Sequence, residues 1–379
     1  MSSSRPTNPD KKSKLSPLLD TNQPIDWYLD WDGTITKRDT LDALVNISAQ
    51  QNTDVDVHKV WPELGRKYME DAKSLFEEIM KQPPATVDDE KEFLKVMEAA
   101  EIRSVDRVSS SGIFKGLVPQ DIIQGAKRAV EREDVQIRRG YKEFVDNIVA
   151  RASGNGNSPD DSHNRAKTGD VIPRKDLFTI ISVNWSARFI EECMRAAEIL
   201  PSTQQINLQI CANELENITP NTIPEQRSKP SSTSTSPHPD KESQPTPPPS
   251  TGHIIPSPST PSRILFSRDK LHLFSQTSAP NEKGDPVPRI YIGDSWTDFE
   301  CLLAADLGIC IRDEPMTEAQ RKLEDSFRRV GIRCCWLLDL VDRSEGEVGM
   351  EEGCVVWVRD FGEINEWLEG GERAEIGIE

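Results

Sequence analysis

The chain has 379 residues, enough for one large domain or two ordinary ones, and a formal net charge of −18. This charge argues against nucleic acid or an anionic membrane as a partner, because both attract clustered lysine and arginine. It leaves a phosphorylated small molecule open, since a local cation reverses the sign of a pocket. Only 35% of the residues are apolar and 27 are proline, which predicts disordered segments around a core of ordinary composition.

The cysteine and hydropathy patterns predict a cytoplasmic protein with reduced thiols. The seven cysteines form no C-x-x-C pair, and several lie in apolar runs, as buried thiols do. The five histidines are scattered, which disfavours zinc. The first 20 residues contain no apolar segment of the signal-peptide kind, and no stretch approaches the length of a membrane span. We therefore expect no membrane partner, while protein partners are left open.

The first part of the chain predicts one strand followed by a long helical region. Residues 1–24 are polar and are predicted to be disordered. The short apolar run Trp27–Leu29 predicts a buried strand. Over residues 40–135 apolar side chains recur at helical spacing, as in Phe93–Val108. We expect this region to form a helical unit inserted after the first strand.

Strands then alternate with helices to the end of the chain. The predicted elements are a helix at 140–151, a strand at 177–183, a helix at 186–200, strands at 206–211 and 290–292, a helix at 299–305, and strands at 307–311 and 354–358. Short apolar strands alternating with helices favour an α/β fold, in which a parallel sheet is covered by helices on both faces.

One segment of different composition interrupts this pattern. Residues 219–262 hold 12 of the 27 prolines, with serine and threonine between them and few large apolar side chains. Such a segment buries too little surface to offset its ordering entropy. It is predicted to be a disordered insertion, either tolerated at the surface or with a regulatory role.

Four short segments carry residues suited to phosphoryl chemistry, and three of them directly follow predicted strands. They are Asp30-x-Asp32-x-Thr34, Ser182, Lys270 at the start of an amphipathic stretch, and Gly293-Asp294-Ser295-x-x-Asp298. Because side chains alternate along a strand, we expect Asp30 and Asp32 to face the same side. Ligands of an open α/β sheet bind outside the carboxyl ends of its strands. The four segments therefore predict one site at that edge.

Each segment also has a structural interpretation when it is taken alone. A serine that ends a strand often caps a helix, and acids after Gly293 could do the same. Lys270 could be a solvated surface lysine, with Lys283 as the alternative cation. The order of the four segments favours the functional interpretation.

The four segments resemble the motifs of the haloacid dehalogenase (HAD) superfamily of phosphatases. The branch similar to phosphoserine phosphatase, with a helical cap, fits best, and Ala212–Leu215 and Asp39 also resemble that branch. Less closely, the chain resembles fungal HAD-like proteins associated with cold tolerance. The resemblance implies a Rossmann-like core over 25–218 and 263–379, a helical cap over 40–135, and the insertion at 219–262.

This resemblance also implies a reaction and a role for each residue. It implies Mg²⁺-dependent hydrolysis of a small phosphorylated metabolite through an aspartyl-phosphate, with Asp30 as nucleophile and Asp32 as general acid and base. It implies a metal set of Asp30, Asp32 and Asp294, with one contact through a backbone carbonyl. The implied phosphate-binding residues are Thr34, Ser182, Asn184 and Lys270, and the implied supporting residues are Gly33, Asp39 and Asp298. Asp298 would hold Lys270 or a metal-bound water.

Several alternatives stay open on the sequence alone. A phosphotransferase would use the same intermediate, and a non-catalytic regulatory or binding protein could share the scaffold. Trp31 is expected in the core, whereas Trp185 and Trp296 either line the mouth of the pocket or pack against the cap. Asp39 with a cap arginine, Arg103 or Arg107, could take the amino and carboxylate groups of phosphoserine.

Overall fold

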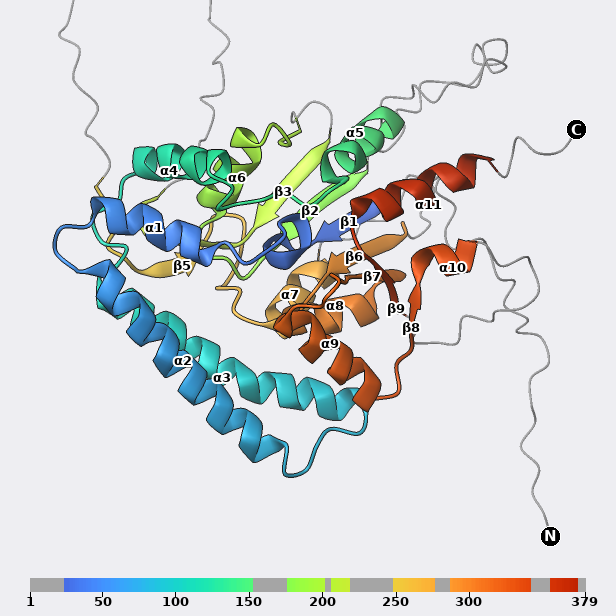
Figure 1. Ribbon diagram of the computed structural model, residues 1–379, viewed down its shortest axis with the longest axis horizontal. Coiled ribbons are helices and arrows are strands. Elements are labelled where there is room, and N and C mark those ends of the chain that lie inside the picture. The colour runs from blue at the N-terminus through green and yellow to red at the C-terminus, as the bar shows by residue number, and fades with distance from the viewer. Residues whose placement is uncertain are drawn as a thin grey trace, which may run out of the picture.

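The computed structural model describes residues 24–152, 176–201, 206–218, 248–276, 287–341 and 355–373. Within these ranges seven parallel strands form one sheet (Figure 1). In spatial order they are β3 (Asn207–Cys211), β2 (Leu177–Ile181), β1 (Asp26–Leu29), β6 (Arg289–Gly293), β7 (Leu307–Ile311), β9 (Val355–Val358) and β8 (Cys334–Trp336). The expected parallel α/β sheet is confirmed, although β8 was not predicted.

Side chains of the sheet alternate between two apolar cores. Trp27 and Leu29 of β1 point into one core, and Tyr28 points into the other. The helices that cover the first core are α5 (Tyr141–Ala152), α6 (Ala187–Ala196) and α11 (Phe361–Arg373), and those on the opposite face are α7 (Ser267–Gln276), α8 (Phe299–Ala304) and α9 (Glu318–Arg329) (Figure 1). A short helix, α10 (Leu337–Val341), follows β8. Burial of both faces explains the continuous apolar runs of these strands.

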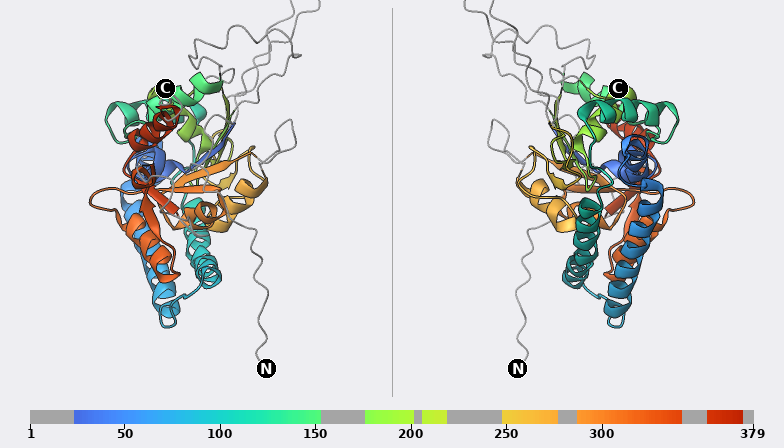
Figure 2. Two further views of the ribbon diagram at one scale, coloured as in Figure 1. Left: turned by 90° about the vertical axis from the view of Figure 1, so that its right-hand side faces the viewer. Right: turned by 90° about the vertical axis from the view of Figure 1, so that its left-hand side faces the viewer.

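Four of the helices between β1 and β2 lie in residues 40–135, the segment that we call the cap. They are α1 (Leu41–Gln51), α2 (Val57–Ile79), α3 (Val87–Ser111) and α4 (Pro119–Glu131). Thr36 forms an isolated bridge with Ile137, so the chain leaves and re-enters the core at adjacent points. Figures 1 and 2 show α2 and α3 extending as a long hairpin on the side of the sheet where α9 lies.

The far end of this hairpin is attached to the core. The rings of Phe76 and Phe93 lie 6.1 and 5.3 Å from that of Trp296, which belongs to the 3₁₀ turn η3 (Trp296–Asp298). Glu90 of α3 forms an ion pair with Arg329 of α9 at 2.6 Å. These contacts hold α2 and α3 against the carboxyl side of β6.

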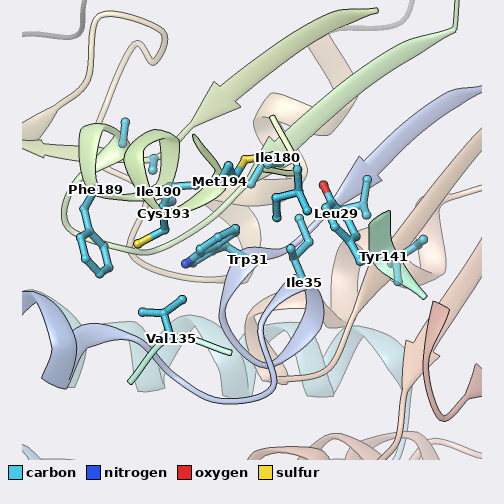
Figure 3. Close-up of a cluster of buried hydrophobic side chains, with 14 of the residues drawn as sticks. Leu29, Trp31, Ile35, Val135, Tyr141, Ile180, Phe189, Ile190, Cys193 and Met194 are labelled. Atoms are coloured by element: carbon cyan, nitrogen blue, oxygen red, sulfur yellow. The ribbon is translucent and has the colours of Figure 1, made fainter. Parts of the chain in front are cut away.

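The three tryptophans near the motifs all pack against protein. Trp31 is fully buried and lies beside Cys193 and Met194 of α6 (Figure 3), so its expected place in the core is confirmed. Trp185 packs edge-on against Trp61 and Phe114 of the cap, and Trp296 packs as described above. Packing against the cap is therefore the interpretation that the structure supports for Trp185 and Trp296.

The proline-rich segment differs in part from its prediction. Residues 248–262 are described and contain β5 (Ile254–Pro256), which pairs antiparallel with β4 (Asn213–Leu215). Ser250 exchanges backbone hydrogen bonds with the cap, donating to Leu117 O at 2.7 Å and accepting from Gly116 N at 2.8 Å. The prediction of disorder is wrong for 248–262, because main-chain pairing and burial of Ile254 stabilise a segment whose composition is poor in apolar residues. Residues 219–247, like 1–23 and Lys283, lie outside the described residues.

Two expectations about composition can also be compared with the structure. Cys193, Cys211, Cys301 and Cys310 are buried thiols, as their apolar surroundings predicted. In the ranges given above, every helix is too short or too polar to cross a lipid bilayer.

One buried polar atom of the sheet yields a stability prediction. The hydroxyl of Thr179 in β2 is fully buried and has no hydrogen-bond partner among the residues that the structure describes. Thr179→Val replaces this hydroxyl by a methyl group of similar size, so we expect it to raise the free energy of unfolding by about 1 kcal/mol. Urea unfolding followed by circular dichroism measures the change, and a midpoint lower than that of the wild type would contradict the prediction.

Candidate active site

Three polar residues meet at the carboxyl edge of the central strands. Asp30 follows β1, Ser182 follows β2 and Asp294 follows β6, and β1 pairs with both neighbours. Asp30 N donates to Ile292 O at 2.9 Å, which continues the pairing of β1 and β6 past the end of β1. All three side chains are almost completely buried. The expected convergence of these segments at one edge is observed.

A buried lysine joins two of the acids. Lys270 lies on α7, is fully buried, and places Nζ 2.8 Å from Asp30 Oδ1 and 2.8 Å from Asp298 Oδ1. Burial alone would lower the pKa of Lys270, but the two carboxylates outweigh it and hold this pKa above its usual value. Lys270 is therefore a fixed positive charge beside Asp30.

The carboxylate of Asp298 is saturated with donors and anchors this lysine. Its Oδ1 also accepts the hydroxyl of Tyr291 at 2.7 Å. Its Oδ2 accepts the backbone N–H groups of Asp294 at 3.1 Å and Ser295 at 3.0 Å. Asp298 thus fixes both the position of Lys270 and the turn that carries Asp294.

The acids at this edge fit a divalent cation. Carboxylate oxygens of Asp30, Asp294 and Asp298 lie within 4.8 Å of one another. Three buried carboxylates against one buried ammonium leave an excess of negative charge, and hard oxygen donors suit Mg²⁺. Burial, with repulsion from the neighbouring acids, raises the pKa of Asp294 well above its usual value. Because Asp298 already accepts several donors, Asp30 and Asp294 are the residues best placed to hold a cation.

Burial also changes the pKa of Asp30, the candidate nucleophile. It raises the pKa of Asp30 to about 8, against an opposing effect of the Lys270 charge. A cation between Asp30 and Asp294 favours the ionised form of both carboxyls.

The side chain of Asp32 has hydrogen-bond partners of its own and is not among the three clustered carboxylates, although its charge helps to raise the pKa of Asp30. The strand ends at Leu29, and the chain then enters an irregular turn, η1 (Trp31–Ile35), in which Gly33 has φ of 75°. The Asp32 carboxylate instead accepts from Thr40 N at 2.8 Å, from Thr40 Oγ1 at 2.6 Å and from Asn184 Nδ2 at 2.9 Å. The acids that gather are Asp30, Asp294 and Asp298, so a cation contact from Asp32 would have to use its backbone.

Two of the expected phosphate ligands have other partners. The hydroxyl of Thr34 is fully buried and donates to Asp294 Oδ1 at 3.4 Å, and the amide of Asn184 is bound to Asp32. Ser182 Oγ accepts from Asn184 N at 3.1 Å, which leaves its own proton available to a phosphoryl oxygen. Lys270 and Ser182 remain the donors best placed for phosphate.

The cap residues considered for phosphoserine also have partners. Arg103 and Arg107 both pair with Asp71, at 3.3 and 2.7 Å, and Nε and Nη2 of Arg107 have no hydrogen-bond partner among the described residues. Asp39 is exposed and accepts from Leu41 N at 2.7 Å at the start of α1.

Sequence reasoning missed Arg138 and Thr40, and it singled out Asn213 only as part of the segment Ala212–Leu215. Arg138 is buried and donates to the carbonyls of Gly33 at 2.6 Å and Thr34 at 3.0 Å, which fixes the turn after Asp30. Asn213 donates to the carbonyl of Asn184 at 3.1 Å and so holds the loop after β2. Thr40, which binds Asp32, has the sequence signature of a helix N-cap. Asn213 follows a predicted strand, which was a usable signal, whereas nothing local marked Arg138.

The turn after Asp30 yields a prediction with a matched control. A Cβ on Gly33 would lie 2.3 Å from Asp294 Oδ2, and its φ of 75° is strained for other residues. Gly331 has nearly the same φ, 77°, with no atom within 4 Å of the corresponding position. We expect Gly331→Ala to cost about 1 kcal/mol and Gly33→Ala at least about 2 kcal/mol more, measured by urea unfolding. Equal losses would show that the close approach to Asp294 is unimportant.

Comparisons with known proteins returned similarities at low identity. No family model matches the chain. A CTO1 family protein of Schizosaccharomyces pombe is 24% identical over 289 residues, covering 76% of this chain and 81% of that protein. A phosphoserine phosphatase, solved as a phospho-aspartyl intermediate analogue, is 13% identical with a TM-score of 0.39, covering 91% of this chain and 98% of its own. A Bordetella pertussis Tohama I protein of unknown function is 11% identical with a TM-score of 0.41, covering 80% of this chain and 96% of its own.

Proposed function

We propose that this protein is a Mg²⁺-dependent phosphomonoester hydrolase that acts on a small phosphorylated metabolite. The observation that carries the proposal is the Asp30 carboxylate, which lies between a buried ammonium and a second buried acid. A carboxylate attacks an anionic phosphate ester only where positive charge screens the approach. Lys270 supplies one such charge, and Asp30 with Asp294 would hold a second.

The chain's own residues account for both steps of such a reaction. Asp30 attacks phosphorus, the bond from phosphorus to the ester oxygen breaks, and an aspartyl-phosphate forms. Asp32 gives a proton to the departing oxygen and then takes one from the water that cleaves the intermediate. Lys270 and the Ser182 hydroxyl stabilise the charge on the non-bridging oxygens. When bound, Mg²⁺ would neutralise the carboxylates and the phosphate together.

The attachment of the cap supports a small substrate. The α2–α3 hairpin is joined to the core through Trp296 and through the ion pair between Glu90 and Arg329. A second ion pair joins Glu98 of α3 to Arg268 of α7 at 3.0 Å. A cap fastened at these points restricts access and excludes bulk water during reaction.

Asp30→Asn tests the proposal directly. We expect this variant to lose at least about 1,000-fold in phosphate release from a panel of phosphomonoesters, because an amide is not a nucleophile at phosphorus. Chelation of divalent cations should abolish the activity of the wild type, and added Mg²⁺ should restore it. Circular dichroism and urea unfolding verify that the variant is folded.

The control is an exposed aspartate of α5. In the part of the chain that the structure describes, Asp146 pairs with Lys142 at the surface, so Asp146→Asn should leave turnover unchanged. Full activity of Asp30→Asn, or no Mg²⁺-dependent phosphate release by the wild type across the panel, would refute the proposal. Phosphate transfer to added alcohols in preference to water would assign a phosphotransferase instead.

A further inference from the structure

We propose that Thr40 and Asn184 are positioning residues that orient the Asp32 carboxylate so that proton exchange with the leaving group uses its Oδ2 atom. This inference rests on the proposed function, because it concerns how the general acid of that reaction is aligned. It is based on the hydrogen bonds that join Trp31, Thr40, Asn184 and Asp32. In each of these bonds the chemical nature of the two groups determines which one is the donor.

The direction of the Thr40 hydroxyl follows from its neighbours. The indole Nε1 of Trp31 lies 3.2 Å from Thr40 Oγ1, and Asn184 Nδ2 lies 3.1 Å from it. Both nitrogens are donors only, so they occupy the two lone pairs of the hydroxyl oxygen. The single hydroxyl proton therefore points at Asp32 Oδ1, 2.6 Å away.

The two oxygens of Asp32 are consequently not equivalent. Oδ1 accepts the hydroxyl of Thr40 and also its backbone N–H, at 2.8 Å. A proton added to Oδ1 would lie close to these two donated hydrogens and would be repelled by them. Oδ2 accepts Asn184 Nδ2 at 2.9 Å and keeps room for one more hydrogen. The geometry thus leaves Oδ2 as the atom that carries the transferred proton.

The partners of Asp32 are themselves rigid. Asn184 is fully buried, its Oδ1 accepts from Ser186 N at 3.2 Å, and its backbone N–H binds Ser182 Oγ. Trp31 is fixed in the apolar cluster beside α6 (Figure 3). Three segments, the turn after β1, the start of α1 and the loop after β2, therefore position one carboxylate. Such support from fixed neighbours is what a proton-transferring group needs to keep its alignment.

Thr40→Val tests this role through the basicity of the leaving group. Valine keeps the shape of threonine but removes the hydroxyl that aligns Asp32. The nitrophenolate released from p-nitrophenyl phosphate is weakly basic and needs little protonation, whereas the alkoxide released from benzyl phosphate needs a proton as it leaves. The burst of alcohol or phenol release in the first turnover reports this step alone.

We expect Thr40→Val to slow the burst with benzyl phosphate about 10- to 100-fold and the burst with p-nitrophenyl phosphate less than about threefold, with little change in KM. Thr40→Ser keeps the hydroxyl and should restore most of the benzyl phosphate rate. Asn184→Ala removes the donor to Oδ2 and should show the same selectivity for the alkyl ester. Thr179→Val, a buried threonine whose hydroxyl has no partner among the described residues, is the matched control and should change neither rate.

Two results would overturn the positioning role. One is an equal loss on both esters, and the other is a Thr40→Ser variant as slow as Thr40→Val. Either would assign Thr40 to stability alone, which urea unfolding measures separately. If the wild type cleaves other phosphomonoesters but not these two, the comparison uses the aryl phosphate and the alkyl phosphate that it cleaves best. A wild type that cleaves none refutes the proposed function itself, and this inference with it.

Discussion

The ammonium group of Lys270 lies between two buried carboxylates, and the candidate site is organised around it. Removing one member of a buried charged set leaves the others uncompensated, at a cost of about 3–5 kcal/mol. Asp298 therefore has to be held as firmly as Lys270, which the Tyr291 hydroxyl and two backbone N–H groups achieve. Burial raises the pKa of both Asp30 and Asp294, and a cation bound by these two carboxyls would favour their ionised forms.

The alternation of the central strand explains how this charge set is assembled. Tyr28 points toward the face that α7 covers, and Asp30 follows it by two residues, so Asp30 meets a lysine from that helix. Trp31 points to the opposite core, against α6. The chain then turns at Gly33, and Asp32 meets groups from the cap and from the loop after β2. The two acids at the end of β1 therefore have different partners: Asp30 contacts Lys270, and Asp32 contacts Thr40 and Asn184. These different partners suit two different chemical roles.

Much of this arrangement was predictable from the sequence. Apolar runs followed by acids or serine identified β1, β2 and β6 and the convergence of Asp30, Ser182 and Asp294. The hydrogen-bond partners of Asp32 were not predictable, because Thr40 comes from the start of α1 and Asn184 from the loop after β2. Whether the side chains of Thr34 and Asn184 are available to a ligand depends on the residues that pack against them in the folded protein. The role of Arg138 depends on the fold in the same way, because Arg138 lies about 100 residues from the turn that it contacts. The ordered strand β5 was missed because composition does not report main-chain pairing.

The pairing of β4 with β5 has a consequence for where the chain leaves and rejoins the core. Leu215 and Ile254 are partners in adjacent strands, and Asn217 donates its side-chain amide to the carbonyl of Pro249 at 3.1 Å, so the two described ends on either side of residues 219–247 are neighbours. On the same ribbon, Asn213 donates to the carbonyls of Asn184 and Ile264. The pair of strands that closes the chain at this point therefore also supports the loop that orients Asp32.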